Sequence, residues 1–311
     1  MGDNRKIAVI GDAFADLHTN IIAYPQNGDA TYGTPLKRNG GGTAGNIAAG
    51  LGVLGADVSL ICRLGDDEVG HFIKDGLVSA NVDSDGIFMD TEGASGVVLI
   101  AVVPDGERTI WVLANGSAYE KLSVENLNYM EKIQPQAIFI SGFMMGVHPA
   151  EEAIFEVIPK WKGKAKIYFD PNLRYPPDAT PPEVKKSMQR MSELSDVVLS
   201  GYSEMRALDL KPRKGQTFIV KKGKEGSYLL NEDGGEEFYV LPTEHIAVDA
   251  TGAGDAYAAA YVYAETAGLD VRNAMKFATV AAGFSVTVQG ARSMPTKQTI
   301  DNYINGENGE R

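Results

Sequence analysis

Short runs of apolar residues alternate along the chain with stretches in which apolar residues recur at helical spacing. The runs at residues 6–10 and 58–62 are bounded by glycine or polar residues, as is typical of buried strands. Between them, a set of residues recurs every three or four positions and predicts a helix: Ala44, Ile47, Ala48, Leu51 and Leu54. A second helix is predicted at residues 69–80. This part of the chain therefore predicts buried strands covered by helices.

The alternation becomes regular after residue 127. Strand and helix patterns follow in turn, with strands at 137–140, 166–169, 196–199 and 217–220 and helices near 149–160, 182–194 and 203–209. Such alternation predicts an α/β fold with a mostly parallel sheet and helices on both faces, because parallel strands need crossover connections. Residues 226–230 and 237–241 indicate an antiparallel extension at one edge, and the last third is helical, at 254–268 and 271–288.

One hairpin interrupts this alternation. The runs at residues 96–103 and 109–113 flank Pro104, Asp105 and Gly106, a combination that favours a tight turn. We interpret the hairpin as a small β flap that projects from the sheet. Because the sequence shows neither an internal repeat nor a low-complexity linker, we expect a single domain over residues 1–311.

The composition is that of a globular protein and argues against several partners. Hydrophobic residues make up 44% of the 311 residues, and the formal net charge is −12. An acidic surface argues against nucleic acid or an anionic membrane as the main partner, although backbone N–H groups can still bind phosphate. Cys62 is the single cysteine, so no intramolecular disulfide can form. We expect a cytoplasmic protein without a signal peptide or a membrane span.

The segment VDATGAGDAYAAAYVYA, residues 248–264, carries the strongest chemical signal. Gly252, Ala253 and Gly254 lie where a loop becomes a helix, and small residues there let backbone N–H groups converge on an anion. Asp255 follows in the first helical turn, where an acid also stabilises the helix, so Asp255 alone is ambiguous. An anion hole beside a carboxylate, however, is what phosphoryl transfer to an alcohol requires, with the carboxylate as base.

Two rival nucleotide-binding folds lack their signatures in this chain. Residues 11–16, after the first predicted strand, do not show the G-x-G-x-x-G pattern of dinucleotide-binding proteins. The Gly-Lys pairs are followed by Ala165 and Glu225 rather than by the serine or threonine of a P-loop. The anion hole therefore belongs to another class of fold.

Two segments resemble the signatures of the ribokinase-like (PfkB) carbohydrate kinases. Residues 249–255, DATGAGD, are similar to the second signature, and residues 40–46, GGGTAGN, followed by RLGDDEVG at 63–70, are similar to the first. The resemblance covers essentially the whole chain. It implies a three-layer α/β/α sandwich with a small β lid over the sugar site, formed by segments within about 12–40 and 95–115. It also implies transfer of the γ-phosphoryl group of ATP to a hydroxyl of a small sugar or sugar acid.

The resemblance assigns roles to residues on the sugar side. Asp255 matches the catalytic base, and Gly252, Ala253 and Gly254 match its anion hole. The residues that match sugar contacts are Asp12, Asp16, Gly41, Gly42, Asn46 and Arg174. Carboxylates and amides suit this role because they form several hydrogen bonds with hydroxyl groups. Plainer interpretations stay open, since Asp12 could cap a loop and the glycines could serve only a tight turn.

Arg174 gives the best clue to the sugar. It ends the stretch DPNLR at residues 170–174, which resembles that of fructokinases and 2-keto-3-deoxygluconate kinases and differs from ribokinase itself. Arg174 could bind a substrate carboxylate or a phosphate oxygen, or it could form only a surface ion pair. The sugar is therefore not named by the sequence, and fructokinase, 2-keto-3-deoxygluconate kinase and ribokinase types all stay open.

On the nucleotide side, the resemblance implies ATP and Mg²⁺ as cofactors and leaves K⁺ open. The residues that match nucleotide contacts are Lys221, Gly223, Gly226, Thr251 and Ser285. Glu204 matches an acid that helps to hold Mg²⁺ through water, and Asp249 matches part of a monovalent-cation site. Gly201 departs from the family, which usually has asparagine at this position. We expect activity to survive, because Mg²⁺ binds largely through water and the nucleotide phosphates.

The sequence also bears on assembly and leaves two alternative functions open. Apolar strands of the lid would be exposed in a single chain and are more stable when another surface buries them. We therefore expect a homodimer formed through the β lid. A nucleoside kinase of the same family and a non-catalytic sugar-binding regulator are the alternatives to a sugar kinase. The regulator would be favoured if the base were missing, and Asp255 is present.

Overall fold

The strands of this computed structural model, which describes residues 6–306, form two sheets. The larger sheet consists of β1 (Ile7–Ile10), β4 (Val58–Gly65), β5 (Ile87–Asp90), β8 (Ala137–Ser141), β9 (Lys166–Asp170), β10 (Val197–Gly201), β11 (Thr217–Lys221), β12 (Ser227–Leu230) and β13 (Glu236–Val240). Their order is β13–β12–β11–β10–β9–β8–β1–β4–β5, parallel from β11 to β5, with β12 and β13 antiparallel at one edge. The mostly parallel sheet predicted from the sequence is confirmed.

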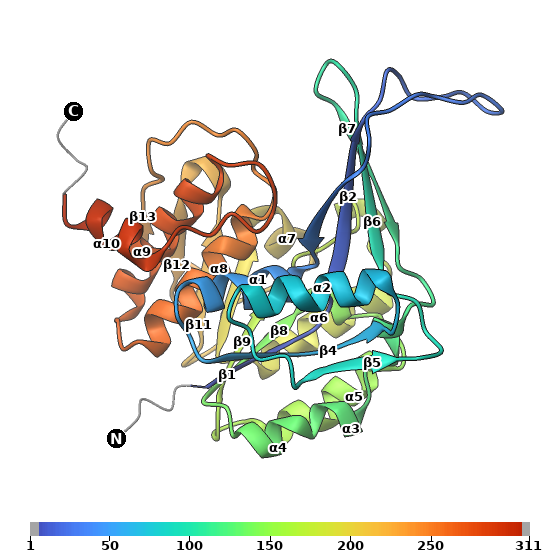
Figure 1. Cartoon of the computed structure of the whole chain (residues 1–311). Coiled ribbons are helices and arrows are strands. Elements are labelled where there is room, and N and C mark those ends of the chain that lie inside the picture. Colours follow the sequence, from blue (N-terminus) through green and yellow to red (C-terminus); the bar gives the residue numbers. More distant parts are fainter. Residues whose placement is uncertain (1–5, 307–311) are drawn as a thin grey trace.

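Helices cover both faces of the larger sheet and complete the predicted three layers. They are α1 (Thr43–Val53), α2 (Glu68–Ser79), α3 (Val124–Leu127), α4 (Tyr129–Ile133), α5 (Ala150–Val157), α6 (Pro182–Leu194), α7 (Tyr202–Ala207), α8 (Ala253–Thr266), α9 (Val271–Ser285) and α10 (Lys297–Ile304). Helices α1, α2, α8 and α9 pack on one face, and α3, α4, α5 and α6 pack on the other (Figure 1).

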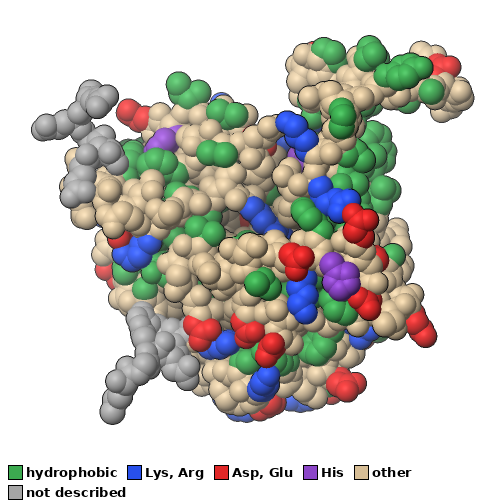
Figure 2. All heavy atoms as spheres, in the orientation of Figure 1, with side chains coloured by type: hydrophobic (Ala, Val, Ile, Leu, Met, Phe, Trp, Pro, Cys, Tyr) green, Lys and Arg blue, Asp and Glu red, His purple; other side chains and the backbone are tan. Residues whose placement is uncertain are grey.

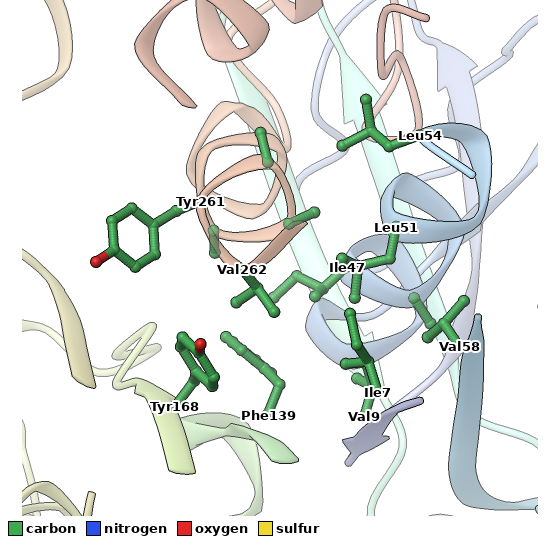
Figure 3. Packing of buried hydrophobic residues seen from close by; sticks show 14 of the residues in the cluster. Ile7, Val9, Ile47, Leu51, Leu54, Val58, Phe139, Tyr168, Tyr261 and Val262 are labelled. Atoms are coloured by element: carbon green, nitrogen blue, oxygen red, sulfur yellow. The ribbon is translucent and has the colours of Figure 1, made fainter. Parts of the chain in front are cut away.

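Two apolar cores lie on either side of the sheet, because side chains alternate between the faces of a strand. In β1, Ile7 and Val9 join the core under α1 and α8, whereas Ala8 and Ile10 join the opposite core. Figure 3 shows the first of these cores, to which α8 contributes Val262. This packing holds α1 and α8 on the same face, so the glycine-rich motifs at their N-termini come together.

The smaller sheet forms a lid that projects from the body of the molecule (Figure 1). Its strands, in spatial order, are β3 (Lys37–Gly41), β2 (Phe14–Asn20), β6 (Val97–Val102) and β7 (Arg108–Leu113). The predicted hairpin is present as β6 and β7, and β2 pairs with both β3 and β6. Figure 2 shows apolar side chains on the projecting part of the lid. The connection between β2 and β3 carries the exposed apolar residues Ile22, Tyr24, Tyr32 and Leu36.

Strand β5 and the end of helix α9 differ from the prediction, and the short helices α3 and α4 lie in a stretch for which no helix was predicted. The sequence pattern gives no sign of β5, because its middle residues are only partly buried and it pairs with β4 alone, at the edge of the sheet. Helix α9 ends at Ser285 instead of near residue 288, because the carbonyl of Val286 accepts hydrogen bonds from the N–H groups of Val248 and Asp249. Within residues 6–306, no helix is both long and apolar enough to cross a bilayer.

Candidate active site

Helix α8 begins in a turn that favours an anion. Gly252 precedes the helix with a left-handed φ of 78°, and a Cβ there would lie 2.4 Å from the carbonyl oxygen of Ala291. Only glycine fits this position. The first N–H groups of a helix have no intrahelical partner, and the helix dipole adds positive potential. The residues predicted to form an anion hole, Gly252, Ala253 and Gly254, therefore lie at a helix N-terminus suited to phosphate.

Asp255 is buried beside this turn and accepts two hydrogen bonds from amide side chains. Nδ2 of Asn46 donates to Oδ2 over 2.8 Å, and Nδ2 of Asn172 donates to Oδ1 over 3.3 Å. Asn46 belongs to α1, and Asn172 follows β9 with a left-handed φ of 40°. Three segments that are far apart in the sequence thus converge on the predicted base.

Burial sets the charge behaviour of the two acids that face the site. It raises the pKa of Asp255 to about 6, although Arg174 and Lys221 favour the charged form. It also raises the pKa of Asp16 to about 6, against the charges of Arg292 and Arg174. A carboxylate in this range is largely ionised at neutral pH and can still take up a proton, which suits a general base.

Asp12 is a helix cap. Its Oδ2 accepts a 2.7 Å hydrogen bond from the N–H of Thr43, and its Oδ1 accepts one of 2.7 Å from the hydroxyl of Ser141. The side chain is only 1% exposed. The carboxylate of Asp12 therefore joins the start of α1 to the end of β8, and the sugar contacts expected at Asp12 and Asp16 stay predictions.

Close contacts explain the glycines of the first motif. A Cβ at Gly41 would lie 2.0 Å from Oδ1 of Asp16. Gly42 precedes α1 with a φ of 81°, and a Cβ there would lie 2.7 Å from Cα of Ala13. Gly42 thus serves a tight turn, while Gly41 leaves room for the acid that faces the site.

Arg174 faces the acids of the site. Its Nη2 lies 3.3 Å from the hydroxyl oxygen of Thr43, which also accepts a 2.6 Å hydrogen bond from Asn172. The Arg174 side chain is exposed, and its charge lowers the pKa of both Asp255 and Asp16 against the effect of burial. Arg174 therefore lies at the mouth of the site, with a guanidinium that a substrate could reach.

A buried ion pair lies on the nucleotide side. Lys221 at the end of β11 binds Asp170 at the end of β9. A Cβ at Gly254 would lie 3.6 Å from Nζ of Lys221, so the ammonium group is next to the first turn of α8. Burial raises the pKa of Asp170 to about 7, against the charge of Lys221. The lysine therefore adds positive charge to the anion hole.

Glu204 stabilises two backbone segments next to this pair. Its Oε1 accepts the N–H of Leu173 over 2.9 Å, and its Oε2 accepts the N–H of Gly201 over 2.7 Å. A Cβ at Gly201 would lie 2.9 Å from Oε2. The glycine that departs from the family therefore makes room for the carboxylate of Glu204.

A cavity of about 310 Å³ adjoins the anion hole. Its lining is Lys221, Gly223, Lys224, Gly226, Pro242, Thr243, His245, Ala247, Ala250, Ala253, Gly254, Tyr257, Thr279, Ala282, Gly283 and Val286. A largely apolar cavity that ends at a helix N-terminus and a lysine suits a flat base with phosphates. The predicted residues Lys221, Gly223 and Gly226 lie in this lining.

The hydroxyl groups of Ser285 and Thr251, two of the predicted nucleotide contacts, bind neighbouring protein groups, and neither residue lines the cavity. The hydroxyl of Ser285 is buried and donates to the carbonyl of Ala282, within its own helix, and Ala282 and Val286 line the cavity instead. The hydroxyl of Thr251 donates to Oδ1 of Asp249 over 2.6 Å and accepts from Nη1 of Arg108 over 2.8 Å. Thr251 therefore serves the loop before α8 rather than the cavity.

Asp249 organises the same loop. It accepts the N–H of Thr251 over 2.9 Å and the N–H of Gly290 over 3.0 Å, and it lies 3.8 Å from Nη1 of Arg108. Hydrogen bonds from Thr251 and Gly290 hold the pKa of Asp249 below its ordinary value despite partial burial. Because Arg108 belongs to β7, this contact joins the lid to the loop of the anion hole.

Asp170, Asn172 and Arg292 were not among the predicted site residues. Asp170 ends β9 and Asn172 follows it, at the carboxyl edge of the sheet, where α/β sheets bind ligands, and this position could have identified them. Arg292 offers no local signal, because it contacts Asn46, a residue 246 positions away.

Comparison with known proteins agrees with this geometry. A model of the pfkB family carbohydrate kinases matches residues 4–298. A sugar kinase of Pyrococcus horikoshii, PH1459, is 27% identical over 304 residues, which cover 96% of this chain and 95% of that protein. Its crystal structure superposes with a TM-score of 0.83 over 97% of this chain and 98% of that one, and its complex with ATP superposes with a TM-score of 0.82 over 94% and 96%.

A further relative is the 5-dehydro-2-deoxygluconokinase of Halalkalibacterium halodurans, which is 25% identical over 321 residues, covering 98% of this chain and 96% of that protein. The family model spans nearly the whole chain, and both glycine-rich motifs of this family meet in one site. The protein is therefore a phosphotransferase with a sugar hydroxyl as acceptor, and it belongs to the PfkB family of carbohydrate kinases.

Proposed function

We propose that this enzyme transfers the γ-phosphoryl group of ATP to a hydroxyl of a small sugar or sugar acid, with Asp255 as the base. The observation that carries the proposal is the Asp255 carboxylate, which is buried beside the N-terminus of α8 and held by two amide groups. The ATP complex of the Pyrococcus horikoshii kinase, which is 26% identical to this chain, supports ATP as the donor.

In the proposed reaction, the sugar hydroxyl attacks the γ-phosphorus of ATP. A bond forms between the sugar oxygen and phosphorus, the bond from phosphorus to the β–γ bridging oxygen breaks, and ADP leaves. Asp255 takes the hydroxyl proton as the new bond forms. The N–H groups at Gly252, Ala253 and Gly254, together with Lys221, offset the charge on the transferred group. The lid covers the sugar and excludes water.

Mg²⁺ fits this site as a companion of the nucleotide. Residues 6–306 contain no cluster of three or more Asp, Glu, His or Cys side chains that could hold a metal by themselves. Mg²⁺ keeps several waters and binds phosphate oxygens, so Glu204, close to Asp170, would hold it through water. When bound, the ion neutralises charge on the phosphates. A K⁺ site at Asp249 stays a prediction, and the Arg108 guanidinium would compete with it.

The acceptor that we propose to test first is a sugar acid. The exposed Arg174 guanidinium faces the sugar side, and arginine binds carboxylates through two parallel hydrogen bonds. Relatives named 5-dehydro-2-deoxygluconokinase support the same class. Asp16 and Asn46 are the residues that we propose for sugar hydroxyls. Neutral ketoses and aldoses are the next class, and nucleosides are the alternative within the family.

The decisive experiment measures ADP release with ATP and Mg²⁺ across a panel of sugar acids, ketoses, aldoses and nucleosides, in potassium and in sodium salts. Asp255→Asn is the matched control, because it keeps the shape of the side chain and removes its basicity. We expect turnover with one sugar class and a loss of about 10²- to 10⁴-fold in kcat in this variant, with sugar binding by calorimetry little changed. Near-normal turnover of Asp255→Asn would contradict the proposed base.

A further inference from the structure

Arg292 lies on the loop between α9 and α10, yet its guanidinium reaches the start of α1. Nε donates to Oδ1 of Asn46 over 3.2 Å, and Nη2 donates to the carbonyl of Gly41 over 3.1 Å. A Cβ at Gly40 would lie 2.2 Å from Nη1 of Arg292, and a Cβ at Gly45 would lie 2.8 Å from Nη2. Two glycines of the first motif therefore form a slot for this arginine.

The chemistry of arginine fixes the orientation of the Asn46 amide. A guanidinium carries donors only, so the amide oxygen must face Arg292. Nδ2 of Asn46 then faces Asp255 and donates to its Oδ2 over 2.8 Å. The opposite orientation would place donors against each other at Arg292 and oxygen atoms against each other at Asp255. Arg292 therefore donates to the amide oxygen of Asn46, and the amide nitrogen of Asn46 donates to Asp255.

Arg292 also adds positive charge among buried acids. Burial lowers its pKa to about 10, so the side chain is charged at neutral pH. Its charge opposes the burial that raises the pKa of Asp16, and it interacts with Asp255. The other charged groups that face Asp255 are the cations Arg174 and Lys221 and the acids Asp12, Asp16 and Asp170.

We propose that Arg292 is a positioning residue for phosphoryl transfer, which acts through Asn46 to hold the carboxylate of Asp255 oriented and ionised. The proposal rests on the proposed role of Asp255 as base and adds to it a residue from the loop after α9. Arg292 acts on the base through the amide of Asn46, and its own guanidinium is placed against protein groups rather than against the acceptor.

The test is the pH profile of kcat for Arg292→Leu. A hydrogen bond to a charged group is worth about 1.5 to 3 kcal/mol, so loss of the oriented amide should raise the pKa of the acid limb by about one unit or more. We expect kcat to fall by about 3- to 40-fold near pH 6.5 and the loss to shrink as the pH rises. Arg292→Lys keeps the positive charge but lacks the planar set of donors of a guanidinium. Its pH profile should therefore lie between those of the unchanged enzyme and Arg292→Leu.

Arg63→Leu is the matched control. Arg63 is also partly buried, and its Nη2 lies 3.0 Å from Oδ2 of Asp90, away from the base. Loss of the Arg63 side chain should lower the melting temperature. It should leave the pKa of the acid limb of the kcat profile the same as in the unchanged enzyme. A general loss of packing at Arg292 would produce the same behaviour, and that result would overturn the proposal.

A double-mutant comparison separates the route through Asn46 from direct electrostatics. In an Asn46→Ala background, Arg292→Leu should change kcat by less than about twofold, because coupled residues do not act additively. Full additivity would overturn the route through Asn46. Failure of the base itself is distinguishable, because Asp255→Asn would then keep its turnover whatever the Arg292 variants do.

Discussion

At the scale of single residues, the buried carboxylate of Asp255 predicts how activity depends on pH. Asp255 accepts a proton only when it is ionised, and burial raises its pKa to about 6. We therefore expect kcat to fall as the pH drops through about 6. The folded protein holds this proton more tightly than the unfolded chain does, so acidification from about pH 7 to about pH 5 favours the folded state through this group.

The measurement is kcat between about pH 5 and about pH 8, with melting temperatures in the same buffers. Asp83 and Asp90, whose pKa values are lowered to about 2, stay ionised over this range. The melting temperature should therefore hold or rise while kcat falls, and the Asp16→Asn variant should show the same fall in kcat at acidic pH. A flat activity profile, or a parallel loss of folding, would contradict the assignment.

Gly252 and Gly268 flank the two ends of α8 and form a matched pair for a second prediction. Both have left-handed φ angles, 78° and 97°, but a Cβ at Gly252 would meet Ala291, whereas a Cβ at Gly268 would have no neighbour within 4 Å. Alanine at either position should cost about 1 to 2 kcal/mol of folding free energy for the left-handed backbone, and the clash with Ala291 should add to this cost at Gly252. Only Gly252→Ala should also displace the anion hole and lower kcat by at least about tenfold.

Melting curves and steady-state kinetics of the two alanine variants check this prediction. We expect a loss of stability in both variants, larger in Gly252→Ala, and a loss of activity in Gly252→Ala alone. Equal kinetics in both variants would show that the turn before α8 does not bind the transferred group.

At the scale of elements, the lid is joined to the loop before α8 by one side chain. Arg108 of β7 donates to the hydroxyl of Thr251 and lies 3.8 Å from Asp249. Lid strands β2 and β3 also carry Asp16 and Gly41 of the sugar side. The lid therefore contacts the sugar side and the anion-hole loop at once, and its position should affect both substrates.

Arg108→Ala should weaken this connection. The arginine is half exposed, so its loss should cost about 1 kcal/mol or less in stability, while KM for the sugar rises by about fivefold. Arg272→Ala is the control, because it removes a similarly exposed arginine, paired with Glu237, that lies away from the lid. The measurement is KM for the sugar in both variants by steady-state kinetics. Similar KM values would show that the contact between Arg108 and the loop has no kinetic role.

At the scale of the whole molecule, the lid leaves apolar side chains uncovered. Ile110, Trp111, Val112 and Leu113 of the edge strand β7 are 40% to 57% exposed. Consecutive side chains point to opposite faces of a strand, so both faces of β7 are open. An exposed apolar edge strand pairs readily with a second one, and a second copy of this chain supplies a matching edge. We therefore keep the homodimer through the lid as a prediction.

Sedimentation velocity at micromolar concentration should give the mass of two chains. Lysine at both Ile110 and Val112, which share one face of β7, should yield monomers, whereas lysine at the exposed Val78 and Leu269, on other surfaces, should not. A monomer for the unchanged protein would contradict the predicted assembly.

The sequence alone determined the fold class and much of the site. Alternating apolar runs predicted the parallel sheet, because each strand has to bury both faces. The turn at Gly252 and the acid at Asp255 were visible because their chemistry is local, confined to a few neighbouring residues. The edge strand β5 was not predicted, because its partly buried residues lack the apolar run of a central strand.

Only the tertiary structure decided which side chains meet. The carboxylate of Asp12 accepts hydrogen bonds from Thr43 and Ser141, which come to it from other segments of the chain. Arg292 carried no local signal. Its contact with Asn46 exists because the loop after α9 passes next to Gly252 at the start of α8, and α8 packs against α1. Local patterns determine elements and motifs, whereas contacts between distant segments depend on how the elements pack, and a linear pattern does not record that packing.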